Sequence, residues 1–69
     1  MNNFVINKYF NGNNVRTIAM GNQDDMIREL KASFASWQFF GAQWINGTCF
    51  QVPASGEFNT ITFKLIQID

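Results

Sequence analysis

The side chains that could act as nucleophiles offer little for catalysis. The sequence contains one cysteine, Cys49, and no histidine, so the usual pairs of a nucleophile and a histidine base are excluded. Cys49 has no cationic neighbour in sequence that would favour a thiolate. We therefore expect it to be a small apolar residue within a strand, which is the ordinary role of a free cysteine.

Carboxylates are the other route to catalysis, because a pair of them can act as acid and base. The acidic residues are Asp24, Asp25, Glu29, Glu57 and Asp69. Three of them are close together at the predicted start of a helix, where carboxylates interact favourably with the helix dipole. A carboxylate-based enzyme is therefore the least favoured interpretation. The sequence also lacks clustered metal ligands and a phosphate-binding glycine loop, so we predict no metal and no cofactor.

The charge balance disfavours broad electrostatic binding. Five Lys and Arg residues balance five Asp and Glu residues, and the basic residues are scattered. Proteins that bind nucleic acid normally carry a basic stripe. Binding of single-stranded nucleic acid to an aromatic face of the sheet, with Lys8, Arg16 or Lys64 on phosphate, is therefore the alternative function.

Length and composition indicate one small folded domain over residues 1–69. Aromatic residues make up 16% of the chain and charged residues only 14%, which is the opposite of a disordered composition. No apolar run approaches the ~20 residues of a membrane helix. Because a single cysteine forms no intrachain disulfide, we expect a cytoplasmic protein that does not enter a membrane.

One amphipathic helix is predicted over about residues 23–39. Asn22 is suited to cap it, Asp24 and Asp25 lie in its first turn, and Asp24 is spaced i, i+4 from Arg28. Apolar residues recur at helical spacing within an arc of roughly 100°. These residues are Met26, Ile27, Leu30, Phe34 and Trp37.

Two strands are predicted before the helix, at residues 4–10 and 15–20. The run Asn11–Asn14 between them favours a turn, and both a two-residue and a four-residue loop fit it. After the helix, residues 42–45 and 48–52 flank Asn46-Gly47, which favours a type I′ hairpin. That hairpin would place Trp44 opposite Cys49 and Ile45 opposite Thr48.

The clearest strand pattern covers residues 58–68, after a loop at 53–57. Ile61, Phe63 and Leu65 point to one face, and Thr60, Thr62 and Lys64 point to the other. Ile66 and Ile68 fall on the threonine face. This predicts either a bulge near the end of the strand or an end that is covered on both faces.

These elements predict an α+β fold, an antiparallel sheet of four or five strands with one helix packed on one face (ββαββ or ββαβββ). A single helix covers one face only. Tyr9, Trp44 and Phe50 lie on strands whose second face has no helix, and Phe39 lies opposite the apolar arc of the helix. Either all the rings pack within the monomer, or some are exposed or buried against a partner.

Exposed aromatic rings with little nearby charge are typical of the centres of protein interfaces. We therefore predict a small non-catalytic protein-binding module that binds a host enzyme or a second copy of itself. In size and in the chemistry it lacks, the chain is similar in kind to phage or mobile-element inhibitors such as anti-CRISPR proteins, although no motif carries this likeness. The predicted contact residues, with two acidic residues as a charged rim, are Tyr9, Phe39, Trp44, Phe50, Asp24 and Asp25.

Overall fold

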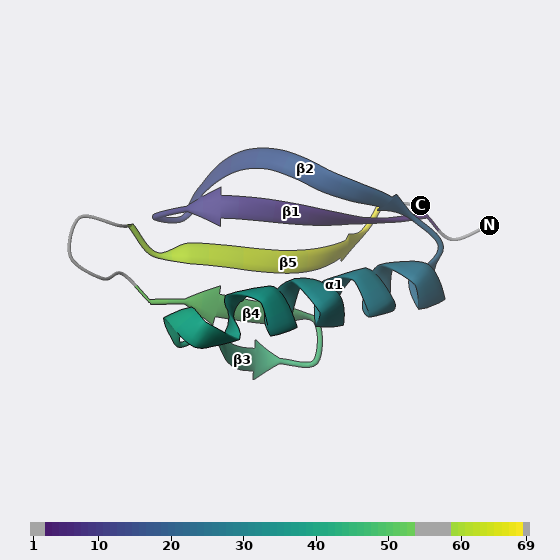
Figure 1. Cartoon of the computed structure of the whole chain (residues 1–69). Coiled ribbons are helices and arrows are strands. Elements are labelled where there is room, and N and C mark those ends of the chain that lie inside the picture. The colour runs from purple at the N-terminus through teal and green to yellow at the C-terminus, as the bar shows by residue number, and fades with distance from the viewer. Residues whose placement is uncertain (1–2, 54–58, 69) are drawn as a thin grey trace.

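The structure is a computed structural model that describes residues 3–53 and 59–68. Its strands form one antiparallel sheet in the order β2-β1-β5-β4-β3, and the helix α1 lies across one face (Figure 1). The predicted α+β fold is confirmed in its five-stranded ββαβββ form. In chain order the elements are β1 (Phe4–Phe10), β2 (Asn13–Gly21), α1 (Gln23–Trp37), the 3-10 turn η1 (Gln38–Phe40), β3 (Gln43–Asn46), β4 (Cys49–Val52) and β5 (Ile61–Gln67).

The first hairpin has the two-residue loop. Asn11 and Gly12 both have positive φ, at 52° and 84°, and Phe10 pairs with Asn13. Asparagine and glycine tolerate this backbone region better than other residues, which is why the turn forms here. As a result β2 begins at Asn13, two residues before its predicted start at residue 15.

The second hairpin has a different register from the predicted one. Trp44 pairs with Phe50 and Asn46 pairs with Cys49, so Ile45 is an extra residue on β3. Neither Asn46 nor Gly47 has positive φ, so the predicted type I′ turn is wrong. The side chain of Asn46 closes the turn instead, because its Oδ1 accepts hydrogen bonds from the Thr48 amide (2.8 Å) and hydroxyl (3.0 Å).

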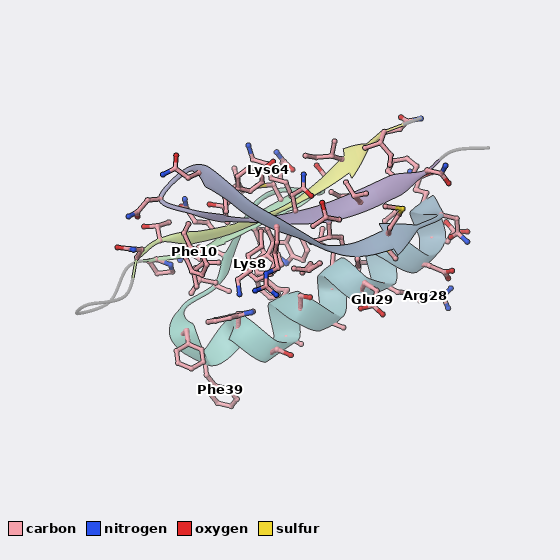
Figure 2. The ribbon with its side chains drawn as sticks, turned by 90° about the horizontal axis from the view of Figure 1, so that it is seen from above. Lys8, Phe10, Arg28, Glu29, Phe39 and Lys64 are labelled. Atoms are coloured by element: carbon pink, nitrogen blue, oxygen red, sulfur yellow. The ribbon has the colours of Figure 1, made fainter. Side chains whose placement is uncertain are left out.

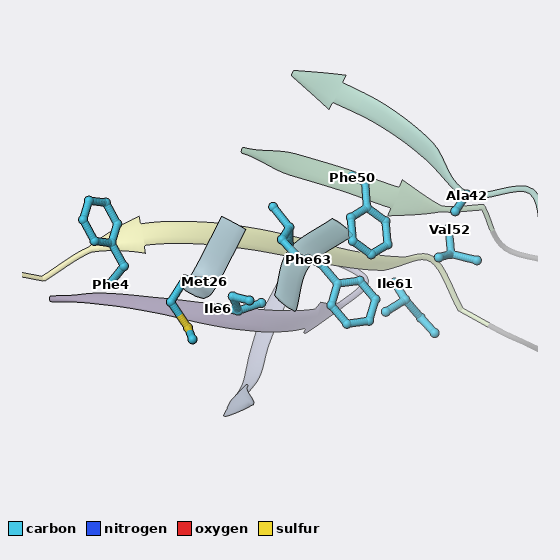
Figure 3. Close-up of a cluster of buried hydrophobic side chains, with 9 residues drawn as sticks. Phe4, Ile6, Met26, Ala42, Phe50, Val52, Ile61 and Phe63 are labelled. Carbon is cyan, nitrogen blue, oxygen red and sulfur yellow. The ribbon is translucent and has the colours of Figure 1, made fainter. Parts of the chain in front are cut away.

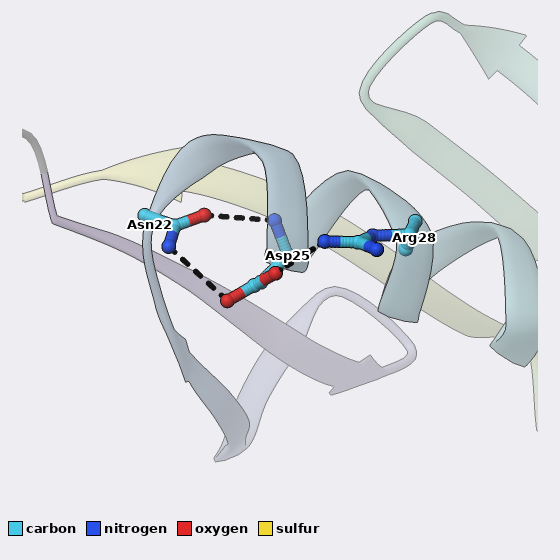
Figure 4. Close-up of polar contacts among 3 residues, drawn as sticks. All are labelled: Asn22, Asp25 and Arg28. Atoms are coloured by element: carbon cyan, nitrogen blue, oxygen red, sulfur yellow. Dashed lines mark hydrogen bonds and ion pairs between the residues drawn. The ribbon is translucent and has the colours of Figure 1, made fainter.

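The start of α1 is held by polar side chains (Figure 4). Asn22 caps the helix, since its Oδ1 accepts from the Asp25 amide at 2.9 Å. Arg28 pairs with Asp25 and not, as predicted, with Asp24. The Asn22 amide donates to the Asp25 carboxylate at 3.1 Å, which orients that carboxylate toward Arg28. The ion pair is exposed, so it adds little stability.

The helix ends earlier than predicted. Its last residue is Trp37, after which Gln38–Phe40 tighten into η1. Gly41 follows in the left-handed region with φ of 85°, which redirects the chain toward β3. The predicted loop at 53–57 and the predicted start of the last strand at residue 58 lie, apart from Pro53, outside the described residues.

The core lies between α1 and the middle of the sheet (Figure 3). Its largest fully buried side chains are Ile6, Leu30, Phe50 and Phe63. The rings of Phe50 and Phe63 stack with centroids 4.6 Å apart and planes 13° apart. Phe50 is 0% exposed, so this predicted contact residue packs within the monomer and offers no surface to a partner. The observed register pairs it with Phe63, which points toward the helix.

We call the side of the sheet away from α1 the open face. Val5 lies on it and is still only 5% exposed, because Met20 and Ile66 are its cross-strand partners on either side. The pairing of β1 with β5 shows no register shift through Ile66. Of the two predictions for the end of β5, the bulge is therefore wrong. Ile66 lies on the open face, opposite to Leu65, because the strand simply alternates.

The core predicts unequal effects for two phenylalanine variants. We expect Phe50→Ala to lower the free energy of unfolding by about 3–5 kcal/mol, because it leaves a cavity among rings. Phe39→Ala should change this free energy by less than about 0.5 kcal/mol, because its side chain is exposed. Urea denaturation followed by circular dichroism measures both values, and equal losses would contradict this description of the core.

Candidate interaction surface

The end of α1 presents two consecutive phenylalanines to solvent. Phe39 is 97% exposed and Phe40 is 63% exposed. Figure 2 shows Phe39 pointing away from both the helix and the sheet. Phe40 packs on Trp37 with ring centroids 5.4 Å apart, whereas Phe39 has no ring contact among the described residues. We call Trp37, Phe39 and Phe40 the aromatic end.

The aromatic end results from how the chain leaves the helix. Ala42, two residues after Phe40, is buried in the core, and the left-handed Gly41 turns the backbone to reach it. The short turn η1 fits between Trp37 and Gly41, and its phenylalanines fall outside the core cluster. The position of these two rings is therefore imposed by backbone geometry.

A groove separates α1 from the edge strand β3. Trp44 stacks on Phe34 with centroids 4.8 Å apart and planes 24° apart. The space beside them has a volume of about 460 Å³ and is also lined by Lys31, Asn46 and Gly47. Trp44 therefore lies on the helix side of the sheet, where its side chain is still 39% exposed. The Trp44–Phe50 pairing is responsible, because it turns both side chains toward α1.

The open face carries Tyr9, because Tyr9 alternates along β1 with the core residues Phe4 and Ile6. The Lys64 ammonium lies 5.3 Å from the centre of the Tyr9 ring, on the side of the sheet away from α1 (Figure 2). A shallow pocket of about 480 Å³ lies beside Lys64, with Cys49, Gln51 and Thr62 in its lining. Burial raises the pKa of the Cys49 thiol, and the nearby Lys64 charge only partly opposes this effect. The thiol is therefore a poor nucleophile at neutral pH.

The structure does not bring the six predicted contact residues together. Asp24 and Asp25 lie at the start of α1, at the opposite end of the helix from Phe39 (Figures 1 and 2). Tyr9 is on the open face, Trp44 lies in the groove and Phe50 is in the core. Among the four aromatic contact residues, Phe39 is the most exposed at 97%, and Trp44 follows at 39%.

Sequence reasoning did not single out Phe40 of the aromatic end, and it placed the neighbouring Lys8 on the wrong face. For Phe40, the adjacent pair of phenylalanines before a glycine could have indicated an exposed turn. Lys8 was expected on the open face, but it lies between β1 and α1 (Figure 2). Its ammonium is 5.3 Å from the Phe10 ring, 5.5 Å from the Trp37 ring and 5.7 Å from the Phe63 ring. The sequence gives no signal for this, because alternation does not say which face is covered.

The described part of the chain contains no group of three or more Cys, Asp or Glu residues that could hold a metal ion. Its helix is too short and too polar to cross a bilayer. Glu57 and Asp69, two of the candidate carboxylates, lie outside the described residues. The chain matches no protein-family model, no curated protein and no solved structure. The surface is therefore interpreted from its own chemistry.

The raised pKa of Cys49 predicts a pH dependence. Because the unfolded thiol ionises first, its contribution to stability is complete below about pH 8.5 and is lost as the pH rises through the folded-state pKa. We expect the urea midpoint of the wild type to fall over this range more than that of Cys49→Ala. We also expect a thiol reagent to modify native protein more slowly than urea-unfolded protein. Equal modification rates would show that the thiol is accessible.

Proposed function

We propose that the protein is a small non-catalytic binding module that docks on a protein partner through its aromatic end. The observation that carries this proposal is the 97% exposure of Phe39 beside the exposed Phe40. Transferring such a side chain from water into an interface contributes about 1.5–3 kcal/mol. Because the Phe39 ring stays in water in the monomer, this free energy is gained only when a partner covers the ring.

The arrangement of the rings also suits binding. Aromatic residues are enriched among the residues that dominate interface energetics. Phe40 is backed by Trp37, and Gly41 ends the turn that carries both phenylalanines. A short turn between a helix and a strand limits how far the rings move, so little conformational entropy is lost on binding.

The partner that we propose is a host enzyme in the cytoplasm, which the module blocks as a phage or mobile-element inhibitor does. A second copy of the chain is the other partner within this proposal. Nucleic acid is less favoured, because Lys64 is the only one of the five basic residues on the open face. Lys8 and Arg16 pair across β1 and β2 on the helix side, and Arg28 and Lys31 belong to α1.

Site-specific crosslinking tests the docking surface. We expect a photoreactive phenylalanine analogue at position 39 to crosslink a protein in lysate of the native cell. The same analogue at position 20, an exposed site on the open face, is the matched control. Light scattering of the purified chain shows whether the crosslinked protein is a second copy. A crosslink from position 20 and none from position 39 would refute docking through the aromatic end.

A further inference from the structure

We infer that Lys8 and Arg16 form a subsite for a carboxylate of the protein partner, next to the aromatic end. This inference rests on the proposed function and names the chemistry that the partner must bring. Lys8 and Arg16 are direct cross-strand partners in the pairing of β1 with β2. Residues opposite one another in an antiparallel pair point to the same face, so both side chains leave the helix side of the sheet from neighbouring strands.

Aromatic rings hold the Lys8 ammonium in place. It lies within 5.7 Å of the ring centres of Phe10, Trp37 and Phe63, and Lys8 itself is half-buried. Trp37 also contacts Phe40, which makes the ammonium a near neighbour of the aromatic end. An anion at this point would be shielded on one side from water by the rings, which strengthens its attraction to the cations.

No acid of the described chain neutralises this pair. The ion pair between Arg28 and Asp25 is the only one among the described residues. Like charges placed directly opposite on neighbouring strands are destabilising, so the arrangement works against the stability of the monomer. Binding of an anion from outside would remove this repulsion.

Charge complementarity favours a partner carboxylate over a nucleic-acid backbone. Binding along a phosphate backbone depends on several cations in a row. Here two cations stand together, whereas Lys64 lies on the open face and Lys31 lines the groove next to β3. An isolated cation pair beside exposed rings suits one acidic side chain at the rim of a protein interface.

A peptide titration tests the subsite on the intact protein. The probe is acetylated tetraglutamate amide, with tetraglutamine as the uncharged control, in ~10 mM salt, where screening is weak. The readout is the NMR signal of the Trp37 indole N–H. We expect tetraglutamate to shift this signal and tetraglutamine to leave it in place. Arg16→Gln and Lys8→Gln should each weaken tetraglutamate binding about tenfold, as loss of one charged hydrogen bond predicts.

Lys64→Gln is the matched control, because it removes one cation that also contacts a ring but lies on the open face. It should bind tetraglutamate as the wild type does. If Lys8→Gln does not fold, Arg16→Glu tests the same subsite. It should abolish binding and raise Tm by about 2 °C, because an ion pair replaces the repulsion.

Three results would overturn the subsite: no shift of the Trp37 signal at low salt, an equal loss of binding in Lys64→Gln, or tighter binding of a thymidine oligonucleotide than of tetraglutamate. The last result would indicate a phosphate ligand. The two proposals fail separately. Crosslinking from position 39 without tetraglutamate binding refutes the subsite alone, and tetraglutamate binding without the crosslink refutes docking through the aromatic end.

Discussion

The stacked rings of Phe50 and Phe63 are the contact on which the rest of the structure depends. They join β4 to β5 at the centre of the core with their planes nearly parallel. The helix docks on this pair through Phe34 and Trp37. The Phe34 ring meets the Phe50 ring edge-on with centroids 5.4 Å apart, and the centroids of the Trp37 and Phe63 rings are 6.1 Å apart. A slip of one residue in β4 would turn Phe50 to the open face and remove this support. The pair therefore sets both the register of the sheet and the position of α1.

The surface features near the end of the helix follow from the same docking. Trp37 is the last helical residue, and its ring touches the core on Phe63, the exposed Phe40 and the Lys8 ammonium. Because the chain must then reach the buried Ala42, η1 leaves its phenylalanines in solvent. One tryptophan thus links the core to an apolar projection and to a cation. This proximity is the reason for proposing that end of the molecule as the docking site.

The open face is not the aromatic platform that a bare sheet could offer. At one end, Met20 and Ile66 flank Val5 and bury it without any help from α1. At the other end, Tyr9 and Lys64 contact one another. Among the described residues, most aromatic rings lie on the helix side, where those of α1, β3, β4 and β5 contact one another. Most of the described aromatic rings therefore pack within the monomer, although a single helix covers only one face of the sheet. The phenylalanines of the aromatic end are the main exception.

The sequence by itself determined the features that depend on neighbours along the chain. Helical spacing and the Asn22 cap placed α1, and alternation placed the strands, so the α+β class and the existence of both hairpins were predictable. Other features depended on contacts between distant segments. Alternation distinguishes two faces but does not say which one the helix covers, so it did not show that Phe50, Trp44 and Lys8 all lie on the helix side. The order of the strands and the register of the second hairpin were decided only when the rings of α1 packed against those of β4 and β5.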